Sequence, residues 1–235
     1  MSRSSLRQKI TSRIPGFGKL VSLTLPRAQV FQVAYALELW GSAECGSGVG
    51  SELAATQNVR AYLPELFQRL HVSKFLDAPC GDWNWMRRVD LSGVDYVGAD
   101  VVSALVAKNN QQYARTGVRF IHADLTKDDL PTVDLIMCRD CWVHLSFQDI
   151  AAMLKNFRRT GATWLLVSNT PGQDRNQNQR TGIEWRFLNL RLPPFNFPPE
   201  IESRSDHYPD EPSPLTLWRL ADLPDVNVES YGTRG

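Results

Sequence analysis

Short apolar segments alternate with helical patterns between residues 74 and 168, and this alternation limits the possible folds more than any other feature. Each strand and helix together take roughly 20 to 30 residues, a spacing typical of a parallel sheet covered by helices on both faces. The expected strands are 74–78, 96–99, 119–123, 133–138 and 163–168. The expected helices are 31–40, 56–70, 83–89, 103–115 and 147–159.

The character of the chain changes after Pro171, where a polar segment leads into a proline-rich one. Two short apolar stretches follow, around Ile201 and over 215–220, and they predict an antiparallel pair of strands. The predicted fold class is therefore α/β, with three layers and a sheet of seven mostly parallel strands that ends in a C-terminal antiparallel hairpin.

Composition excludes several classes of protein. The 235 residues are 43% hydrophobic and 22% charged, as in one globular domain. The 26 basic residues nearly balance the 25 acidic ones, which argues against a dedicated nucleic-acid-binding protein. No apolar run approaches the roughly 18 residues of a membrane span. The four cysteines are too few for a disulfide-stapled secreted scaffold, so we expect free thiols and a cytoplasmic protein.

The N-terminal segment 1–37 carries only basic charges, six in number, and the first acid is Glu38. We set it apart as a basic leader before a domain at 38–224 and a tail at 225–235. Three interpretations stay open for the leader. It is a frayed solvated segment, a peripheral contact with anionic lipid, or an organellar transit peptide if the source is eukaryotic.

Four successive strands are each followed by an acid: Asp77, Asp100, Asp124 and Asp140. A single acid after a strand is often only a helix cap. Because the carboxyl ends of parallel strands meet at one edge, four such acids predict a ligand site there. An acid after the second strand can accept hydrogen bonds from vicinal ribose hydroxyls.

The turn after the first strand limits the kind of ligand. A dinucleotide site needs three glycines around the pyrophosphate, whereas this turn holds the single Gly81 between Asp77 and Asp82. Two carboxylates would repel a pyrophosphate and suit a cationic or hydroxyl-rich ligand, and the expected helix near Asp82 offers free N–H groups. The turn therefore disfavours NAD and ATP.

These segments resemble the class I S-adenosylmethionine-dependent methyltransferases, a family with a Rossmann-like sheet. Leu-Asp-Ala-Pro-Cys-Gly-Asp at 76–82 is similar to the first motif of the family. The segments 96–100, 123–125 and 133–138 resemble the next three in order and spacing. The sequence departs from the usual pattern at Pro79, which replaces the first loop glycine. A Trp-Gly-Ser, glycine-rich loop at 40–51 resembles a segment found in a bacterial branch of the family.

The resemblance implies S-adenosylmethionine as cofactor and assigns residues to it. Asp77 and Gly81 would line its methionine part, Asp100 would hold the ribose hydroxyls, and Asp124 with the Leu125 backbone would face the adenine. The further cofactor residues that it implies are Ala78, Pro79, Val101 and Arg139.

Two segments are candidates for the lid and the acceptor pocket. The loop that includes Trp40 and Ser42 is either a mobile flap over the cofactor or an ordinary connector. The polar segment that ends at Arg180, together with Trp185, either forms an acceptor pocket or is a solvated loop.

His144 is the candidate general base, because it lies four residues after Asp140 and a helical turn would place both side chains on one face. Asp140 would then orient His144 or contact the acceptor. The alternative is that His144 only packs or caps. The Cys138–Cys141 pair cannot complete a four-ligand zinc site, so we predict no metal.

The sequence thus predicts an enzyme that transfers a methyl group from S-adenosylmethionine to a small-molecule or glycan acceptor, on oxygen. Two alternatives stay open: an NAD(P)-dependent oxidoreductase on a similar sheet, and a non-catalytic subunit that binds S-adenosylmethionine.

Overall fold

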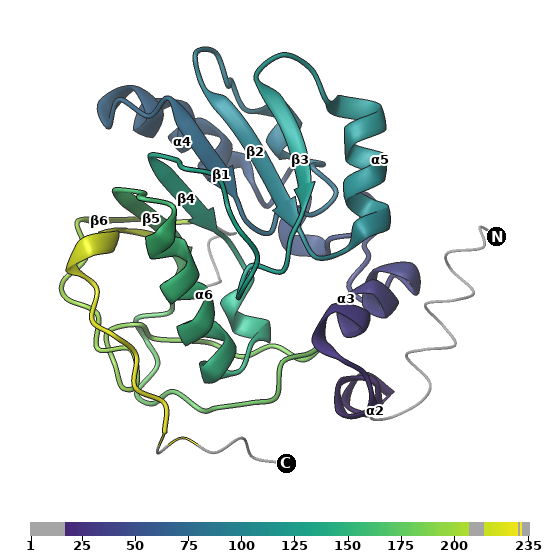
Figure 1. Cartoon of the computed structure of the whole chain (residues 1–235), viewed down its shortest axis with the longest axis vertical. Helices are drawn as coiled ribbons and strands as arrows, with labels where there is room; N and C mark the ends of the chain where they lie inside the picture. The colour runs from purple at the N-terminus through teal and green to yellow at the C-terminus, as the bar shows by residue number, and fades with distance from the viewer. Residues whose placement is uncertain (1–16, 207–213, 230, 232–235) are drawn as a thin grey trace.

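The computed structural model describes residues 17–206, 214–229 and 231 (Figure 1). Its seven strands form one sheet in the order β3-β2-β1-β4-β5-β7-β6. The first five strands in this order run parallel, and β7 pairs antiparallel with β5 and with β6. The strands are β1 (Lys74–Asp77), β2 (Asp95–Asp100), β3 (Val118–His122), β4 (Leu135–Cys138), β5 (Trp164–Ser168), β6 (Glu202–Arg204) and β7 (Leu215–Arg219). The predicted fold class is confirmed.

The five predicted parallel strands and the helices predicted at 56–70 and 103–115 recur within a few residues of their expected bounds, and the helix 147–159 recurs with the same bounds. The helix expected at 31–40 begins earlier, at Arg27, and ends at Ala36. The α-helices are α2 (Phe17–Thr24), α3 (Arg27–Ala36), α4 (Gln57–Arg69), α5 (Ser103–Tyr113) and α6 (Phe147–Arg159). The 3-10 turns are η1 (Val49–Ser51), η2 (Met86–Arg88), η3 (Trp142–His144) and η4 (Leu220–Asp222).

Both faces of the sheet are buried, as the continuous hydrophobicity of the strands requires. In β4, Leu135 and Met137 face a core that includes α4, whereas Ile136 and Cys138 face a core that includes α6. Ser146 caps α6 by accepting a hydrogen bond from the Asp149 N–H, which fixes where that helix begins. The sheet is therefore a rigid platform whose free edge at the carboxyl ends of the strands can carry a site.

The helix predicted at 83–89 is wrong, and so is the helix N-terminus expected near Asp82. Only η2 forms there, because Trp83 takes a left-handed φ of +58° that ends any helical run. The indole of Trp83 is 1% exposed and packs edge-on against Phe120, with Tyr96 also in contact. Burial of this side chain outweighs the local helix preference.

Gly98 brings the turn after β1 close to β2. A Cβ at this position would lie 2.7 Å from the Phe120 ring and 2.9 Å from the Cys80 Cβ. Since only glycine leaves that space, the segment that carries Cys80 and Gly81 is held tightly at the sheet edge.

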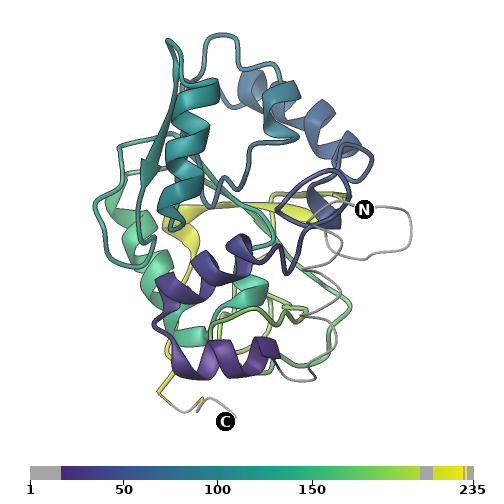
Figure 2. The ribbon, with the colours of Figure 1, turned by 90° about the vertical axis from the view of Figure 1, so that its right-hand side faces the viewer.

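Residues 17–37 of the predicted leader are helical and pack against the rest of the domain, as Figure 2 shows for the two purple helices. Ser22 on α2 accepts a hydrogen bond from the Ile183 N–H, and Val30 and Ala34 on α3 are fully buried. Residues 1–16, which hold four of the six basic side chains, lie outside the described residues, so the membrane contact stays a prediction. Within the described ranges no helix has the length and hydropathy to span a bilayer.

Candidate active site

A cavity of about 420 Å³ lies at the carboxyl ends of the parallel strands. Asp77, Asp100, Asp124 and Asp140, the four acids that follow strands, all line it. The volume falls within the range of about 300–1,000 Å³ found for small-ligand sites. The structure thus brings together the four carboxylates that the sequence singled out.

Most of the other predicted site residues also line this cavity, and three do not. Ala78 is fully buried, and its N–H donates to the Met137 carbonyl. Ser42 holds its own loop by accepting from the Glu44 and Cys45 N–H groups. Arg180 is exposed to solvent. Those that line it are Pro79, Gly81, Val101, Leu125, Arg139, His144, Trp40 and Trp185.

Asp77 and Asp100 are buried carboxyls beneath the cavity. Burial raises the pKa of Asp77 to about 7, against the opposing effect of a 2.7 Å hydrogen bond from the Tyr96 hydroxyl. Burial also raises the pKa of Asp100 to about 6, although this carboxylate accepts hydrogen bonds from the Val102 and Gly81 N–H groups. Both groups therefore titrate close to neutral pH and gain from a bound cation.

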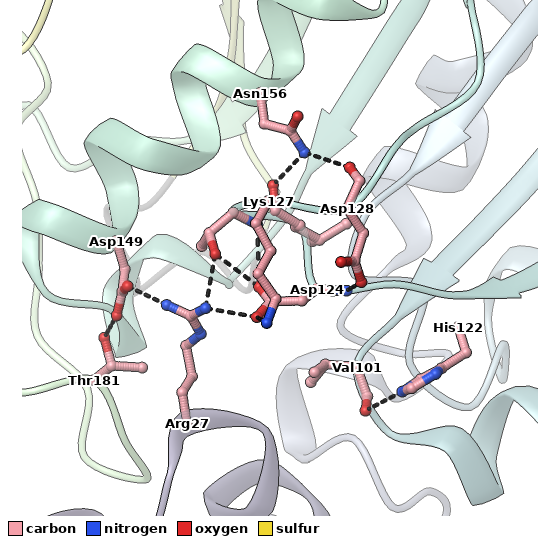
Figure 3. A network of polar contacts seen from close by, with 11 residues as sticks. Arg27, Val101, His122, Asp124, Lys127, Asp128, Asp149, Asn156 and Thr181 are labelled. Atoms are coloured by element: carbon pink, nitrogen blue, oxygen red, sulfur yellow. Dashed lines mark hydrogen bonds and ion pairs between the residues drawn. The ribbon is translucent and has the colours of Figure 1, made fainter.

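Asp124 lines the cavity and belongs to a network of polar contacts (Figure 3). Its carboxylate accepts from the Arg27 guanidinium at 2.6 Å and from the Thr126 hydroxyl at 2.8 Å. Burial acts to raise the pKa of Asp124, but these hydrogen bonds outweigh it and lower the pKa. The next N–H, that of Leu125, donates to none of the described residues and is free to meet a ligand.

The loop 42–51 lies closed across the turn after β1. The Gly46 N–H donates to the Asp82 carboxylate at 2.8 Å, and the Asp82 N–H donates to the Ser47 hydroxyl at 3.1 Å. A Cβ on Gly81 would lie 2.7 Å from the Ser47 Oγ, so a side chain there would push the loop away. Loop and turn together form a close-fitting cradle over Asp77.

Arg139 joins this loop to the sheet. Its guanidinium pairs with Asp206 at 2.8 Å and with Asp140 at 3.2 Å, and it donates to the Gly50 carbonyl at 2.7 Å. The ion pair is buried, with side chains 5% and 0% exposed for Arg139 and Asp206. Burial acts to lower the pKa of Arg139, but the two carboxylates outweigh it and raise the pKa.

His144 is oriented differently from the sequence prediction. Asp140 takes a left-handed φ of +50°, so no continuous helical turn joins it to His144, and its carboxylate pairs with Arg139 and accepts from Ser168. The His144 Nδ1 lies instead 3.0 Å from the Glu184 carbonyl oxygen. A carbonyl only accepts, so Nδ1 carries the proton and Nε2 is the unprotonated nitrogen of the neutral ring. Burial lowers the pKa of His144, which keeps the ring neutral.

Sequence reasoning missed one whole wall of the cavity. Arg27, Phe31 and Tyr35 of α3 all line it, although the segment was set apart as a leader. Their spacing of i, i+4 and i+8 is the pattern of one helix face and could have identified them. Trp85 and Phe187 also line the cavity and were not singled out.

Comparisons with known proteins agree with this geometry. Residues 75–162 match the family model described as a methyltransferase domain. Human N-acetylserotonin methyltransferase, solved with S-adenosylmethionine, aligns with a TM-score of 0.58 and 14% identity over 92% of this chain and 66% of its own. The 1,6-didemethyltoxoflavin-N1-methyltransferase of Burkholderia thailandensis, solved with S-adenosylhomocysteine, aligns with a TM-score of 0.57 and 16% identity over 85% of this chain and 86% of its own.

A third solved structure is the magnesium protoporphyrin IX methyltransferase of Synechocystis PCC 6803, with a TM-score of 0.53 and 13% identity over 83% of this chain and 97% of its own. At these identities the likeness shows the fold. No curated protein matches the sequence. Residues 75–162 are thus similar to a methyltransferase domain, and the sheet has the fold of these S-adenosylmethionine-dependent methyltransferases.

The residues of the cavity fit the cofactor of this class. Gly81 provides a cradle that a Cβ would fill, and the free Leu125 N–H faces a cavity edge where a heterocycle can accept. The buried carboxyls of Asp77 and Asp100 suit a ligand that carries a sulfonium charge. Within the described ranges there is no group of three or more side chains that could hold a metal ion.

Proposed function

We propose that this protein transfers a methyl group from S-adenosylmethionine to a hydroxyl oxygen of a small-molecule or glycan acceptor. One observation carries the proposal: a single cavity joins the acid-lined sheet edge to an aromatic chamber that holds His144. One matched enzyme is by its name an N1-methyltransferase, so the fold alone leaves the acceptor atom open. The histidine base is what favours oxygen, because a hydroxyl must lose its proton on methylation.

When bound, S-adenosylmethionine supplies an activated methyl group, so the protein needs no nucleophile of its own. Asp100 would hold the ribose hydroxyls, and Asp77 would lie near the methionine part. His144 Nε2 would accept the hydroxyl proton while the Glu184 carbonyl holds the ring. The closed loop 42–51 would exclude water and fix the acceptor, and such orientation can contribute on the order of 7–11 kcal/mol to the rate.

The lining of the acceptor chamber suits a neutral, hydroxyl-rich molecule. The two arginines among the described residues that line the cavity, Arg27 and Arg139, are each paired with two carboxylates, which leaves little positive potential for a phosphate or carboxylate. Trp40 lies with its ring centroid 5.1 Å from that of His144, and Trp185 is 56% exposed at the cavity. Flat aromatic faces beside polar groups are typical of sugar and polyol sites.

Calorimetry with purified protein tests the cofactor. We expect S-adenosylmethionine and S-adenosylhomocysteine to bind, and NAD and NADP not to bind. Binding of a nicotinamide cofactor in their place would support the oxidoreductase alternative. A panel of neutral glycosides, phenols and polyols is then incubated with radiolabelled cofactor. Binding without labelled product on any acceptor would support the non-catalytic alternative.

Asp100→Ala is expected to weaken S-adenosylmethionine binding by about 1.5–3 kcal/mol, or roughly ten- to 150-fold, because charged hydrogen bonds are lost. The carboxylate also holds the Gly81 and Val102 N–H groups, so Asp100→Asn, which keeps one acceptor, should lose less. Calorimetry measures both variants. An unchanged dissociation constant for Asp100→Ala would remove this residue from the cofactor site.

Cofactor affinity is expected to rise with pH between about 5.5 and 7.5. Asp77 and Asp100 have pKa values of about 7 and about 6, raised by burial from 3.8, and a bound cation favours their ionised forms. Binding therefore releases protons, with up to roughly a tenfold change in affinity per pH unit for each group that titrates. Calorimetry in buffers of different ionisation enthalpy counts these protons, and an affinity independent of pH would contradict the assignment.

The same raised pKa values make the ligand-free protein less stable as pH rises, whereas cofactor affinity increases with pH. Because both folded pKa values exceed the unfolded value of 3.8, the folded state binds extra protons between about pH 4 and 7. Their contribution to the unfolding free energy therefore falls as pH rises through this window and is constant above it.

We also place the protein in the cytoplasm. The four cysteines are free thiols, and burial raises the pKa of Cys45, Cys80 and Cys138, which supports a structural role for them in a reducing compartment.

A further inference from the structure

Helix α3 forms a wall of the cofactor pocket, and its first residue, Arg27, contacts the sheet domain through a cluster of charges. Arg27, Phe31 and Tyr35 lie on the face that lines the cavity, whereas Val30 and Ala34 are fully buried on another face. From Arg27 to Tyr35 the helix rises by about 12 Å at 1.5 Å per residue, so this face extends along much of a nucleoside-sized cavity.

The Arg27 guanidinium binds two separate parts of the domain at once. One nitrogen donates to the Asp124 carboxylate at 2.6 Å and to the Thr126 hydroxyl at 2.7 Å, in the loop after β3. The other nitrogen donates to Asp149 on α6, whose carboxylate also accepts from the Thr181 hydroxyl. Figure 3 shows the arginine reaching from α3 into the space between these two carboxylates.

The Asp124 carboxylate is bound by Arg27 and is also the group that we assign to the adenine. Asp124 follows β3 in the part of the cavity that we assign to the adenine, and in this structure its Oδ2 accepts from Arg27. The Arg27, Asp124 and Asp149 side chains are 25%, 14% and 21% exposed, so water and salt reach the cluster. Such a contact is strong enough to hold a helix end and weak enough to open.

The other end of α3 covers the opposite part of the cavity. The Tyr35 hydroxyl makes no hydrogen bond to the described residues and packs against Gly46, where a Cβ would lie 2.9 Å from it. Burial, followed by the charges of Asp82 and Asp100, raises the pKa of Tyr35, so it stays a neutral donor over the ribose and methionine end. The Phe31 ring contacts Trp40, which in turn contacts His144.

We propose that Arg27 is a latch: its paired contacts with Asp124 and Asp149 hold α3 closed over the cofactor pocket, and their opening admits and releases S-adenosylmethionine and S-adenosylhomocysteine. The proposal rests on the proposed function, because it assigns the cavity to that cofactor. Arg27 acts through α3 and is therefore a positioning residue. Closure also places Phe31 against Trp40, whose ring packs against His144, so the latch couples cofactor binding to the acceptor chamber.

Stopped-flow binding of S-adenosylhomocysteine to the full-length protein tests the latch, with fluorescence of the cavity tryptophans as the signal. In Arg27→Met, which keeps the length of the side chain without its charge, association and dissociation rates should each rise about fivefold or more. This factor corresponds to about 1 kcal/mol of ion pairing lost from a partly exposed site. Arg27→Lys, which can reach only one carboxylate at a time, should lie between Arg27→Met and the wild type.

Lys127→Met is the matched control. Lys127 also contacts Asp124, at 3.7 Å, but it is 70% exposed and belongs to the same loop, so it cannot hold α3. Its removal should leave both rates unchanged. Equal acceleration in Lys127→Met and Arg27→Met would overturn the latch, since the effect would then come from the charge of Asp124 alone. Unchanged rates in Arg27→Met would also overturn it.

Two further measurements separate the latch from the assigned function and need no activity assay. Raising the salt concentration should accelerate exchange in the wild type and have little effect on Arg27→Met, because the screened contact is already absent. Hydrogen exchange of the ligand-free protein should be faster at residues 27–36 in Arg27→Met, with the sheet unaffected. Failure of the wild type to bind S-adenosylhomocysteine would refute the proposed function, whereas binding with insensitive rates and exchange would refute the latch only.

Discussion

Asp206→Ala is expected to lower the free energy of unfolding by about 3–5 kcal/mol, the largest stability effect that we predict for one substitution. The Asp206 side chain is fully buried and accepts two hydrogen bonds from the Arg139 Nε, at 2.8 and 2.9 Å. When Asp206 is removed, the buried Arg139 guanidinium keeps only Asp140 as a charged partner among the described residues. Asp140 is 33% exposed and balances the charge less well. Losing one partner of a buried pair costs several kcal/mol because the other charge stays desolvated.

Urea unfolding monitored by circular dichroism measures this effect in the absence of ligand. Asp222→Ala, at an exposed acid in η4, is the control and should change stability by no more than about 0.5 kcal/mol. The double variant Arg139→Met with Asp206→Leu should recover much of the loss, since apolar side chains can replace a buried ion pair at little cost. A loss below about 1 kcal/mol in Asp206→Ala would show that the pair is not desolvated in solution.

The layered fold could be predicted because strands that are buried on both faces consist of continuous apolar residues. In β4 every residue of Leu-Ile-Met-Cys is buried, so the apolar run and the strand coincide. The positions of the four acids followed from topology, since parallel strands bring their carboxyl ends to one edge. Asp77 and Asp100 therefore needed no knowledge of the tertiary structure to be placed in the same site.

The features that could not be predicted depend on contacts between distant residues. Trp83 adopts a left-handed backbone because its indole is buried among rings from β2 and β3, which no local propensity reports. Arg27 pairs with acids 97 and 122 residues away, and the basic composition around it indicated a leader instead. The orientation of His144 by the Glu184 carbonyl likewise depends on a loop 40 residues later in the chain. Local sequence patterns thus predicted the sheet and its acids. Long-range packing determines the segments over the cavity, such as α3, and these could not be predicted.

His144→Asn is expected to lower kcat by about 10²–10⁴-fold with an acceptor identified from the panel, the usual contribution of a general base. The asparagine amide can still donate to the Glu184 carbonyl, so it keeps the orienting contact and removes the Nε2 lone pair. Because burial lowers the pKa of His144, wild-type turnover should reach its plateau below the usual pKa of an exposed histidine. The variant should lose this pH dependence.

Cofactor binding separates this effect from simple disruption of the pocket. His144 lies on the acceptor side, against Trp40, whereas the predicted cofactor contacts come from the ends of β1, β2 and β3. The dissociation constant for S-adenosylhomocysteine should therefore change by less than about twofold in His144→Asn. Unchanged turnover with intact binding would show that this acceptor hydroxyl needs no histidine base, and His144 would be removed from the mechanism.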